Sequence, residues 1–162
     1  MKVANLMTRA LIAVRPDDSV EVAVKLLRQR GVRHLLVLKN ARLVGIVSDR
    51  DIKRALDPDR TKKKLLGIGG LYFLLEPILV REIMTPDPIT IRPDVSAQEA
   101  AGVMVAERFG ALPVVRGNDL VGIITETDLL RYFAKLSADE VPAKGEPRQP
   151  GKERTRGKAK KK

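Results

Sequence analysis

The sequence predicts an α/β (α+β) fold in which two β-α-β-β-α units pack as one module with a pseudo-twofold axis. The main observation is an internal repeat: VGIVSDRD at positions 44–51 returns as VGIITETD at 121–128, displaced by 77 positions. Met7-Thr8 returns at the same offset as Met84-Thr85, so a single register without gaps links the two halves. Of the 54 aligned pairs in this register, 17 are identical, where unrelated sequences would share roughly three or four. The chain is therefore a duplication.

Composition is the second observation, and it favours a folded module with a basic tail. The 162 residues are 44% hydrophobic, which is enough to fill one core or a duplicated pair of cores. Cysteine is absent, so disulfides, a cysteine nucleophile and a thiolate metal site are excluded. His34 is the only histidine, which excludes a multi-histidine metal centre. No long apolar run follows Lys2, so the sequence predicts a cytoplasmic protein without a signal peptide.

Each repeat is predicted to open with a short strand and a helix. The strands are the apolar stretches Ile12–Val14 and Ile89–Ile91, each of which runs into a Pro-Asp turn. Ser19 is a natural N-cap for the first helix, and Ser96-x-x-Glu99 is a capping box for the second. The residues at helical spacing that should face the core are Val22, Ala23, Leu26 and Leu27 in the first repeat and Ala100, Val103 and Met104 in the second.

A hairpin and a last helix complete each predicted unit. Two short apolar strands, Leu35–Leu38 and Leu43–Val47, are joined by a polar turn, and the second repeat has Leu112–Val115 and Leu120–Ile124. The last helix begins at Asp49 or Glu126. Its predicted inner face comprises Ile52, Ala55 and Leu56 in the first repeat and Leu129, Leu130 and Phe133 in the second.

The segment between the repeats contains the longest apolar run of the chain, at 65–80. A membrane-spanning helix needs about 20 apolar residues, and this run is shorter and is interrupted by Gly67, Gly69, Gly70, Glu76 and Pro77. We therefore expect no membrane span but a linker, 58–79, with a buried apolar helix. A membrane-surface contact or a gating element remains an alternative, and the three lysines that precede the run favour the membrane surface.

The motif repeated at the end of each unit contains the polar residues of a candidate binding site. Ser48 and Thr125 stand where a strand ends and a helix begins, so the hydroxyl and the free helix N–H groups suit an anion. Asp51 and Asp128 follow three residues later. A carboxylate there could accept hydrogen bonds from the two vicinal hydroxyls of a ribose. The same spacing is also a capping box that only satisfies the helix end, and one residue could do both.

These motifs resemble tandem CBS domains, two of which normally form one Bateman module. The resemblance rests on the Met-Thr opening, the Gly-hydrophobic-hydrophobic-Ser/Thr-x-x-Asp close and the β-α-β-β-α order, and it covers 3–136. It implies CBS repeats at 1–57 and 80–136. The phrases RHLLV at 33–37, LYFLL at 71–75 and ITETD at 124–128 further resemble the acetoin-utilisation (AcuB-like) group.

The resemblance implies two clefts, each lined from both repeats, that bind an adenosyl ligand. The first cleft would be lined by Thr8, Ile12, Ala13, Arg33, His34, Thr125, Thr127 and Asp128, and the second by Thr85, Ile89, Thr90, Gly110, Ala111, Ser48, Arg50 and Asp51. The isoleucines would sandwich a purine and the arginines would meet phosphates. Because Arg33-His34 corresponds to Gly110-Ala111, cations are expected to distinguish the first cleft from the second.

The implied function is that of a non-enzymatic regulatory module with no obligatory cofactor. AMP, ADP, ATP or S-adenosylmethionine would bridge the repeats and shift the module or a homodimer between two packings, which an unidentified regulated protein reads. The sequence contains no catalytic motif. It lacks a P-loop, a serine nucleophile elbow and a histidine paired with a nucleophile.

The net charge of +11 points to a second function class. Segment 137–162 is rich in Lys, Arg, Pro and Gly and has few apolar residues, so it is expected to be disordered. Such an arm binds nucleic acid or an acidic protein weakly and with steep salt dependence. The alternative function is therefore a dimerising scaffold whose basic tail binds a polyanion.

Overall fold

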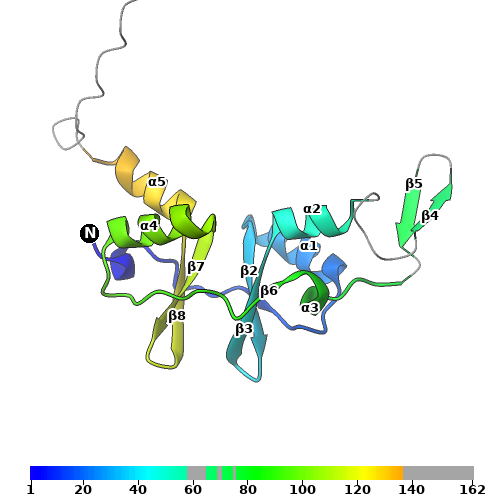
Figure 1. Ribbon diagram of the computed structural model, residues 1–162, viewed down its shortest axis with the longest axis horizontal. Coiled ribbons are helices and arrows are strands. Elements are labelled where there is room, and N and C mark those ends of the chain that lie inside the picture. The colour runs from blue at the N-terminus through cyan, green and yellow to red at the C-terminus, as the bar shows by residue number, and fades with distance from the viewer. Residues whose placement is uncertain (58–64, 69–70, 75, 137–162) are drawn as a thin grey trace, which may run out of the picture.

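Two antiparallel hairpins, one from each repeat, lie side by side at the centre of the molecule (Figure 1). In this computed structural model, which describes residues 1–57, 65–68, 71–74 and 76–136, β2 (His34–Lys39) pairs with β3 (Arg42–Ser48). In the second repeat, β7 (Ala111–Arg116) pairs with β8 (Asp119–Thr125). The predicted hairpins are confirmed, and each strand extends one residue further at both ends.

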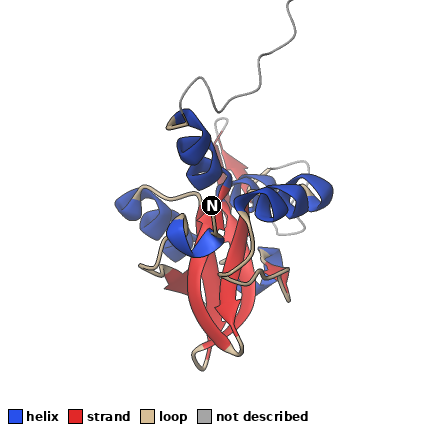
Figure 2. Ribbon diagram, turned by 90° about the vertical axis from the view of Figure 1, so that its left-hand side faces the viewer, coloured by secondary structure: helices blue, strands red, loops and turns tan. Residues whose placement is uncertain are grey.

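The helices flank these strands (Figure 2). They are α1 (Val20–Arg30), α2 (Asp49–Ala55), α4 (Ala97–Glu107) and α5 (Glu126–Ala134), in the order expected of two β-α-β-β-α units. Ser19 caps α1, because its hydroxyl accepts a hydrogen bond from the Val22 N–H at 3.4 Å. Ser96 likewise accepts from the Glu99 N–H at 3.0 Å. Among the described residues, the reciprocal contact of that predicted capping box does not form.

The inner faces of the helices are only partly as predicted. Ile52 and Leu129 are buried, but Leu130 is 67% exposed and Phe133 is 45% exposed. Leu130 follows the buried Leu129, and one residue turns the side chain by about 100° around a helix. Phe133 lies in the last turn of α5, which extends past the end of the hairpin (Figure 1). Two further residues assigned to inner faces, Leu56 and Val22, are also exposed.

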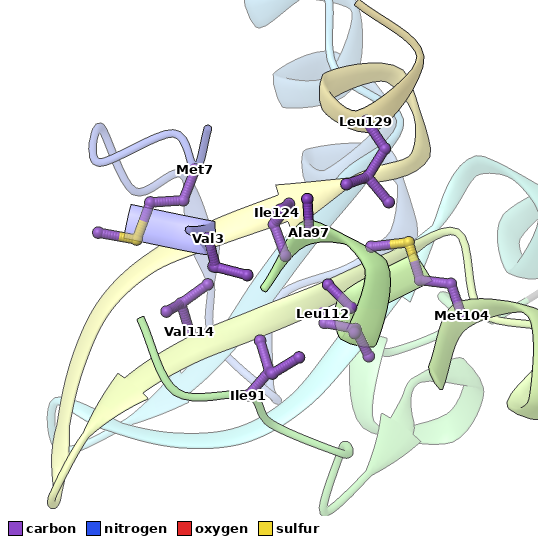
Figure 3. Packing of buried hydrophobic residues seen from close by; sticks show 10 residues of the cluster. Val3, Met7, Ile91, Ala97, Met104, Leu112, Val114, Ile124 and Leu129 are labelled. Carbon is purple, nitrogen blue, oxygen red and sulfur yellow. The ribbon is translucent and has the colours of Figure 1, made fainter. Parts of the chain in front are cut away.

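The start of the chain packs into the core of the second repeat (Figure 3). The short 3-10 helix η1 (Val3–Asn5) places Val3, which is fully buried, against a cluster that includes Leu112 and Ile124, and Met7 joins the same cluster. Backbone hydrogen bonds fix this position, from the Val3 N–H to the Val95 carbonyl at 2.9 Å and between the Thr8 and Ile123 backbones in both directions. The opening segment of repeat one is therefore part of repeat two.

The exchange is reciprocal. Ile78 and Val80, at the start of α3 (Val80–Ile83), are buried in the core of the first repeat with Leu35 and Val47. The next strand, β6 (Thr85–Pro86), pairs with β3. The sheet order is therefore β1-β2-β3-β6, with β1 (Ala13–Val14) parallel to β2. In the second repeat, the equivalent opening stretch makes a single parallel bridge, from Ile91 to Val114.

This exchange accounts for two of the repeated sequence signals. A Cβ placed on Gly122 would lie 2.7 Å from Met7 Sδ, and one placed on Gly45 would lie 2.5 Å from Met84 Sδ. Only glycine leaves room for the methionine of the other repeat to cross the hairpin. The methionine of each Met-Thr opening thus contacts the glycine of the Val-Gly-Ile strand in the other repeat. This contact occurs twice, once in each direction.

The linker does not contain the predicted apolar helix. The structure has two antiparallel strands there, β4 (Leu65–Ile68) and β5 (Leu71–Leu74), which Figure 1 shows beyond α3 at the edge of the molecule. The physical reason lies in the composition, because each glycine costs a helix about 1 kcal/mol relative to alanine and Gly-Gly is a favoured pair between hairpin strands. Within the described ranges, no helix is long and apolar enough to cross a membrane.

Candidate ligand-binding clefts

The helix start at the end of β3 forms a complete capping box. Asp51 Oδ2 accepts hydrogen bonds from the Ser48 backbone N–H at 2.8 Å and from its hydroxyl at 2.6 Å, while Ser48 Oγ accepts from the Asp51 N–H at 3.2 Å. The helix-capping interpretation of the repeated motif is therefore confirmed. The other oxygen, Asp51 Oδ1, accepts no hydrogen bond from the part of the chain that the structure describes.

The second copy has the same geometry. Asp128 Oδ2 accepts from the Thr125 N–H at 2.9 Å and from its hydroxyl at 2.7 Å, and the return bond from the Asp128 N–H measures 3.3 Å. Both aspartates are partly buried. Each carboxylate is thus held in one orientation by one oxygen, while the other oxygen remains available to a hydroxyl donor.

Two clefts open beside these helix starts, and each is lined by both repeats. The first cleft measures about 180 Å³ and the second about 280 Å³. The first is lined by Thr8, Ala10, Ile12, Gly31, Val32, Arg33, His34, Ile123, Thr125, Thr127, Asp128 and Arg131. The second is lined by Arg33, His34, Ile46, Ser48, Asp49, Arg50, Asp51, Arg54, Thr85, Pro88, Ile89, Arg108, Phe109, Gly110, Ala111 and Glu126.

Most of the residues singled out from the sequence line the cleft expected of them. The exceptions are Ala13 and Thr90, which line neither cleft. Each directly follows an isoleucine, Ile12 or Ile89, that does face a cleft. Neighbouring side chains of an extended segment point in opposite directions, so the residue after the isoleucine turns away.

The sequence analysis missed two matched pairs of lining residues. Ile46 and Ile123 occupy equivalent positions on β3 and β8, and each lines the same cleft as the isoleucine of the other repeat's opening segment. Arg54 and Arg131 lie three residues after the helix aspartates, at the spacing that places side chains on one helix face. Identity between the two repeats at these positions was the signal that could have identified them.

Arg33 and His34 do not distinguish the clefts, contrary to the prediction, because both residues line both clefts. They stand at the start of β2, where the two repeats meet, opposite Gly110. A Cβ on Gly110 would lie 3.1 Å from His34 Nε2, so glycine lets the imidazole reach across. Arg33 Nη2 donates a hydrogen bond to Thr127 Oγ1 of the other repeat at 3.1 Å.

The electrostatics of His34 follow from this central position. Burial lowers the pKa of its imidazole below the usual value, and the neighbouring Arg33 guanidinium lowers the pKa further. Three carboxylates, Asp49, Glu126 and Asp51, act in the opposite direction with smaller effect. These effects together favour the neutral form of the imidazole. Among the described residues, no three His, Cys, Asp or Glu side chains gather as a metal site.

We expect the pKa of His34 to lie below about 6.5, the value for an unfolded chain. The unfolded state then takes up the proton first as the pH falls, so the contribution of His34 to stability is fully present above pH 6.5 and declines below it. Imidazole proton NMR gives the pKa directly, because the chain has one histidine. Urea unfolding of wild type and His34→Gln between pH 5 and 7.5 gives the stability effect. A pKa at or above 6.5 would contradict this assignment.

The repeated core, the reciprocal exchange and the paired clefts agree with a family-level match. The family model of the CBS domain matches residues 3–58 and 80–135. The chain belongs to the CBS domain family. It carries two of these domains, and in this chain the described helices, strands and clefts all belong to the pair and its linker.

Solved structures of CBS pairs share the fold. The CBS pair of protein MJ0100, in complex with 5′-methylthioadenosine and S-adenosyl-L-methionine, aligns with a TM-score of 0.68 and 26% identity over 83% of this chain and 96% of that chain. CBSX2 in complex with AMP aligns with a TM-score of 0.63 and 30% identity over 82% and 96%. AcuB from Vibrio cholerae aligns at 0.63 and 27% over 83% and 90%, which confirms the predicted resemblance to that group.

Several curated relatives are much longer proteins. The chain is 36% identical over 126 residues to inosine-5′-monophosphate dehydrogenase of Korarchaeum cryptofilum, a match that covers 77% of this chain but only 23% of the dehydrogenase. The chain therefore matches a minor part of an enzyme in that case.

Proposed function

We propose that this chain is a non-enzymatic regulatory module that binds adenosyl ligands (AMP, ADP, ATP or S-adenosylmethionine) in its two clefts. The observation that carries the proposal is the repetition of one set of side chains in both clefts. The set, written first cleft then second, is Thr8 and Thr85, Ile12 and Ile89, Ile123 and Ile46, Thr125 and Ser48, Asp128 and Asp51, Arg131 and Arg54.

Each part of this set suits a different part of an adenosyl ligand. The two isoleucines, Ile12 and Ile123 in the first cleft, offer apolar surface on either side of a flat purine. The free oxygen of Asp128 suits a ribose hydroxyl, and a charged acceptor strengthens such a bond to about 1.5–3 kcal/mol. Thr125 caps the start of α5 and Arg131 lies in its last turn; both line the cleft and offer donors to a 5′ substituent. The ligands named in the MJ0100 and CBSX2 structures share the adenosine that this set would hold.

The clefts would couple binding to conformation because each one draws its walls from both repeats. A ligand that contacts the opening segment of one repeat and the last helix of the other restrains their relative position. It shifts the module toward the packing that it binds more tightly, by at most its difference in affinity for the two packings. A regulated protein in contact with the module would respond to that shift.

We further propose that the module acts as a homodimer formed through its helices. Large apolar side chains are exposed there, with Val105 79% exposed on α4 and Leu130 67% exposed on α5. If these side chains adjoin on the surface, they would form an apolar interaction surface. Sedimentation velocity at micromolar concentrations should give the mass of a dimer, and a monomer at every concentration would exclude this part of the proposal.

Isothermal titration calorimetry tests the function directly. Protein shown to be free of copurified nucleotide is titrated with AMP, ADP, ATP, S-adenosylmethionine and NAD at moderate salt, so that the basic tail does not attract phosphates nonspecifically. Saturable binding of one or two adenosyl ligands per chain is expected. Absence of binding across the panel would overturn the proposal and favour the alternative of a scaffold with a polyanion-binding tail, which lies outside the described residues.

A further inference from the structure

The second cleft carries an arginine at two positions where the equivalent residue of the first cleft is uncharged. The second cleft contains Arg50 where the first has Thr127, and it contains Arg108 where the first has Gly31. Both clefts retain the arginine of the last helix, Arg54 or Arg131. The duplication thus keeps one guanidinium in each cleft and adds two to the second.

These additional guanidinium groups are free to contact a ligand. Arg50, Arg54 and Arg108 are exposed, and none of them donates a hydrogen bond to the described part of the chain. Arg33, which lines both clefts, is instead held in the first cleft by its bond to Thr127 Oγ1 at 3.1 Å. The second cleft therefore presents three unengaged guanidinium groups, while the first presents one, Arg131.

The second cleft also has two more carboxylates than the first, so its formal charge is the same and the difference lies in which guanidinium groups are unengaged. Asp49, Asp51 and Glu126 line the second cleft, against Asp128 alone in the first. However, Asp49 Oδ2 lies 3.3 Å from Lys53 Nζ in an ion pair, while Asp51, like Asp128 in the first cleft, has one oxygen in a helix cap. Glu126 lies near Gly110 and His34, where the two repeats meet. The cleft is also the larger of the two, at about 280 Å³ against about 180 Å³.

We infer that the two clefts select different adenosyl ligands. The second cleft takes a nucleotide with a phosphate chain, a di- or triphosphate, which Arg50, Arg54 and Arg108 bind through their planar donor pairs. The first cleft takes an adenosyl ligand with a small or uncharged 5′ substituent. The inference rests on the proposed function, since it assigns ligand classes to the same two clefts.

The duplication supplies the variants that test this assignment. Arg50→Thr with Arg108→Gly gives the second cleft the residues of the first, and Thr127→Arg gives the first cleft a residue of the second. Glycine suits position 108, where the backbone has φ 58° in the left-handed region. A control with Arg28→Thr and Arg116→Thr removes the same charge from exposed positions outside both clefts.

Calorimetry with ATP and with adenosine, at fixed salt, gives the preference of each site. In wild type, ATP should bind one site at least tenfold more tightly than the other, whereas adenosine should discriminate less. The double variant should lose roughly 100-fold or more in ATP affinity at the tight site, because it removes two guanidinium–phosphate contacts and each such contact is worth roughly 10- to 100-fold. Adenosine, which has no phosphate, should change less than about threefold. Thr127→Arg should tighten ATP at the weak site.

Failure of this inference can be distinguished from failure of the proposed function. If ATP and adenosine both bind but the double variant matches the charge control, the ligand assignment is overturned while adenosyl binding stands. If neither compound binds the wild-type protein, the proposed function fails, and the inference fails with it. An ATP preference that disappears in the charge control as well would reduce the effect to net charge and would also overturn the assignment.

Discussion

Removal of residues 1–8 is expected to unfold the second repeat, although the deleted segment opens the first. Val3 is fully buried and Met7 is 8% exposed in the core that contains Leu112 and Ile124. Full burial of a valine or methionine side chain contributes about 1.5–3 kcal/mol. The deletion therefore removes roughly 3–6 kcal/mol of the 5–15 kcal/mol typical of a domain. Urea unfolding followed by circular dichroism measures the loss, and amide hydrogen exchange locates it in α4, α5, β7 and β8.

A single substitution separates the loss of core packing from the effect of shortening the chain. Met7→Ala should cost about 2–5 kcal/mol, the usual range for a buried methionine. Lys39→Ala, at an exposed position at the end of β2 and outside both clefts, should change the free energy of unfolding by less than about 0.5 kcal/mol. If Met7→Ala is as mild as Lys39→Ala, or if exchange protection is lost in the first repeat instead, the reciprocal exchange is not the native packing.

The elements that the sequence predicted correctly are those with strong local signals. Ser19 caps a helix through its own hydroxyl, and the alternation of apolar runs with polar turns defined both hairpins. Duplication doubled each signal. An ambiguous strand or cap in one repeat could be checked at the equivalent position of the other.

Features that depend on tertiary packing were not accessible in the same way. The local sequence around Val3 or Ile78 does not reveal that each residue packs with the other repeat. Apolar residues predict burial, but they do not indicate which element they will pack against. The apolar linker was wrongly assigned to a helix for a related reason. A short apolar run has no period that separates a strand from a buried helix, and Gly69-Gly70 was the better indicator.

In the candidate clefts, too, residues in a local motif were predicted and residues brought together by the fold were not. Ser48, Asp51 and their equivalents follow from a motif whose spacing fixes local geometry. Arg54 and Arg108 were missed because they enter the second cleft from two different elements, the end of α2 and the C-cap of α4. Their proximity is a property of the fold.

Replacement of Asp51 and Asp128 by asparagine is expected to abolish most adenosyl binding. Asparagine keeps the size of the side chain and one oxygen for the helix cap, but it loses the charge and places a donor where a hydroxyl needs an acceptor. A hydrogen bond to a charged group contributes about 1.5–3 kcal/mol, so each cleft should lose roughly 10- to 100-fold in affinity. Calorimetry with AMP and S-adenosylmethionine on the single and double variants measures this loss.

Loss of the helix cap is the competing explanation, and a matched variant isolates it. Ser96→Ala removes a cap at α4, outside both clefts, and should cost about 0.5–2 kcal/mol of stability with no change in ligand affinity. If the aspartate variants lose affinity well beyond what Ser96→Ala does at equal stability, the carboxylates act on the ligand. If the double variant binds AMP and S-adenosylmethionine as wild type does, Asp51 and Asp128 serve the fold alone, because the capping boxes that the structure contains already account for one oxygen of each.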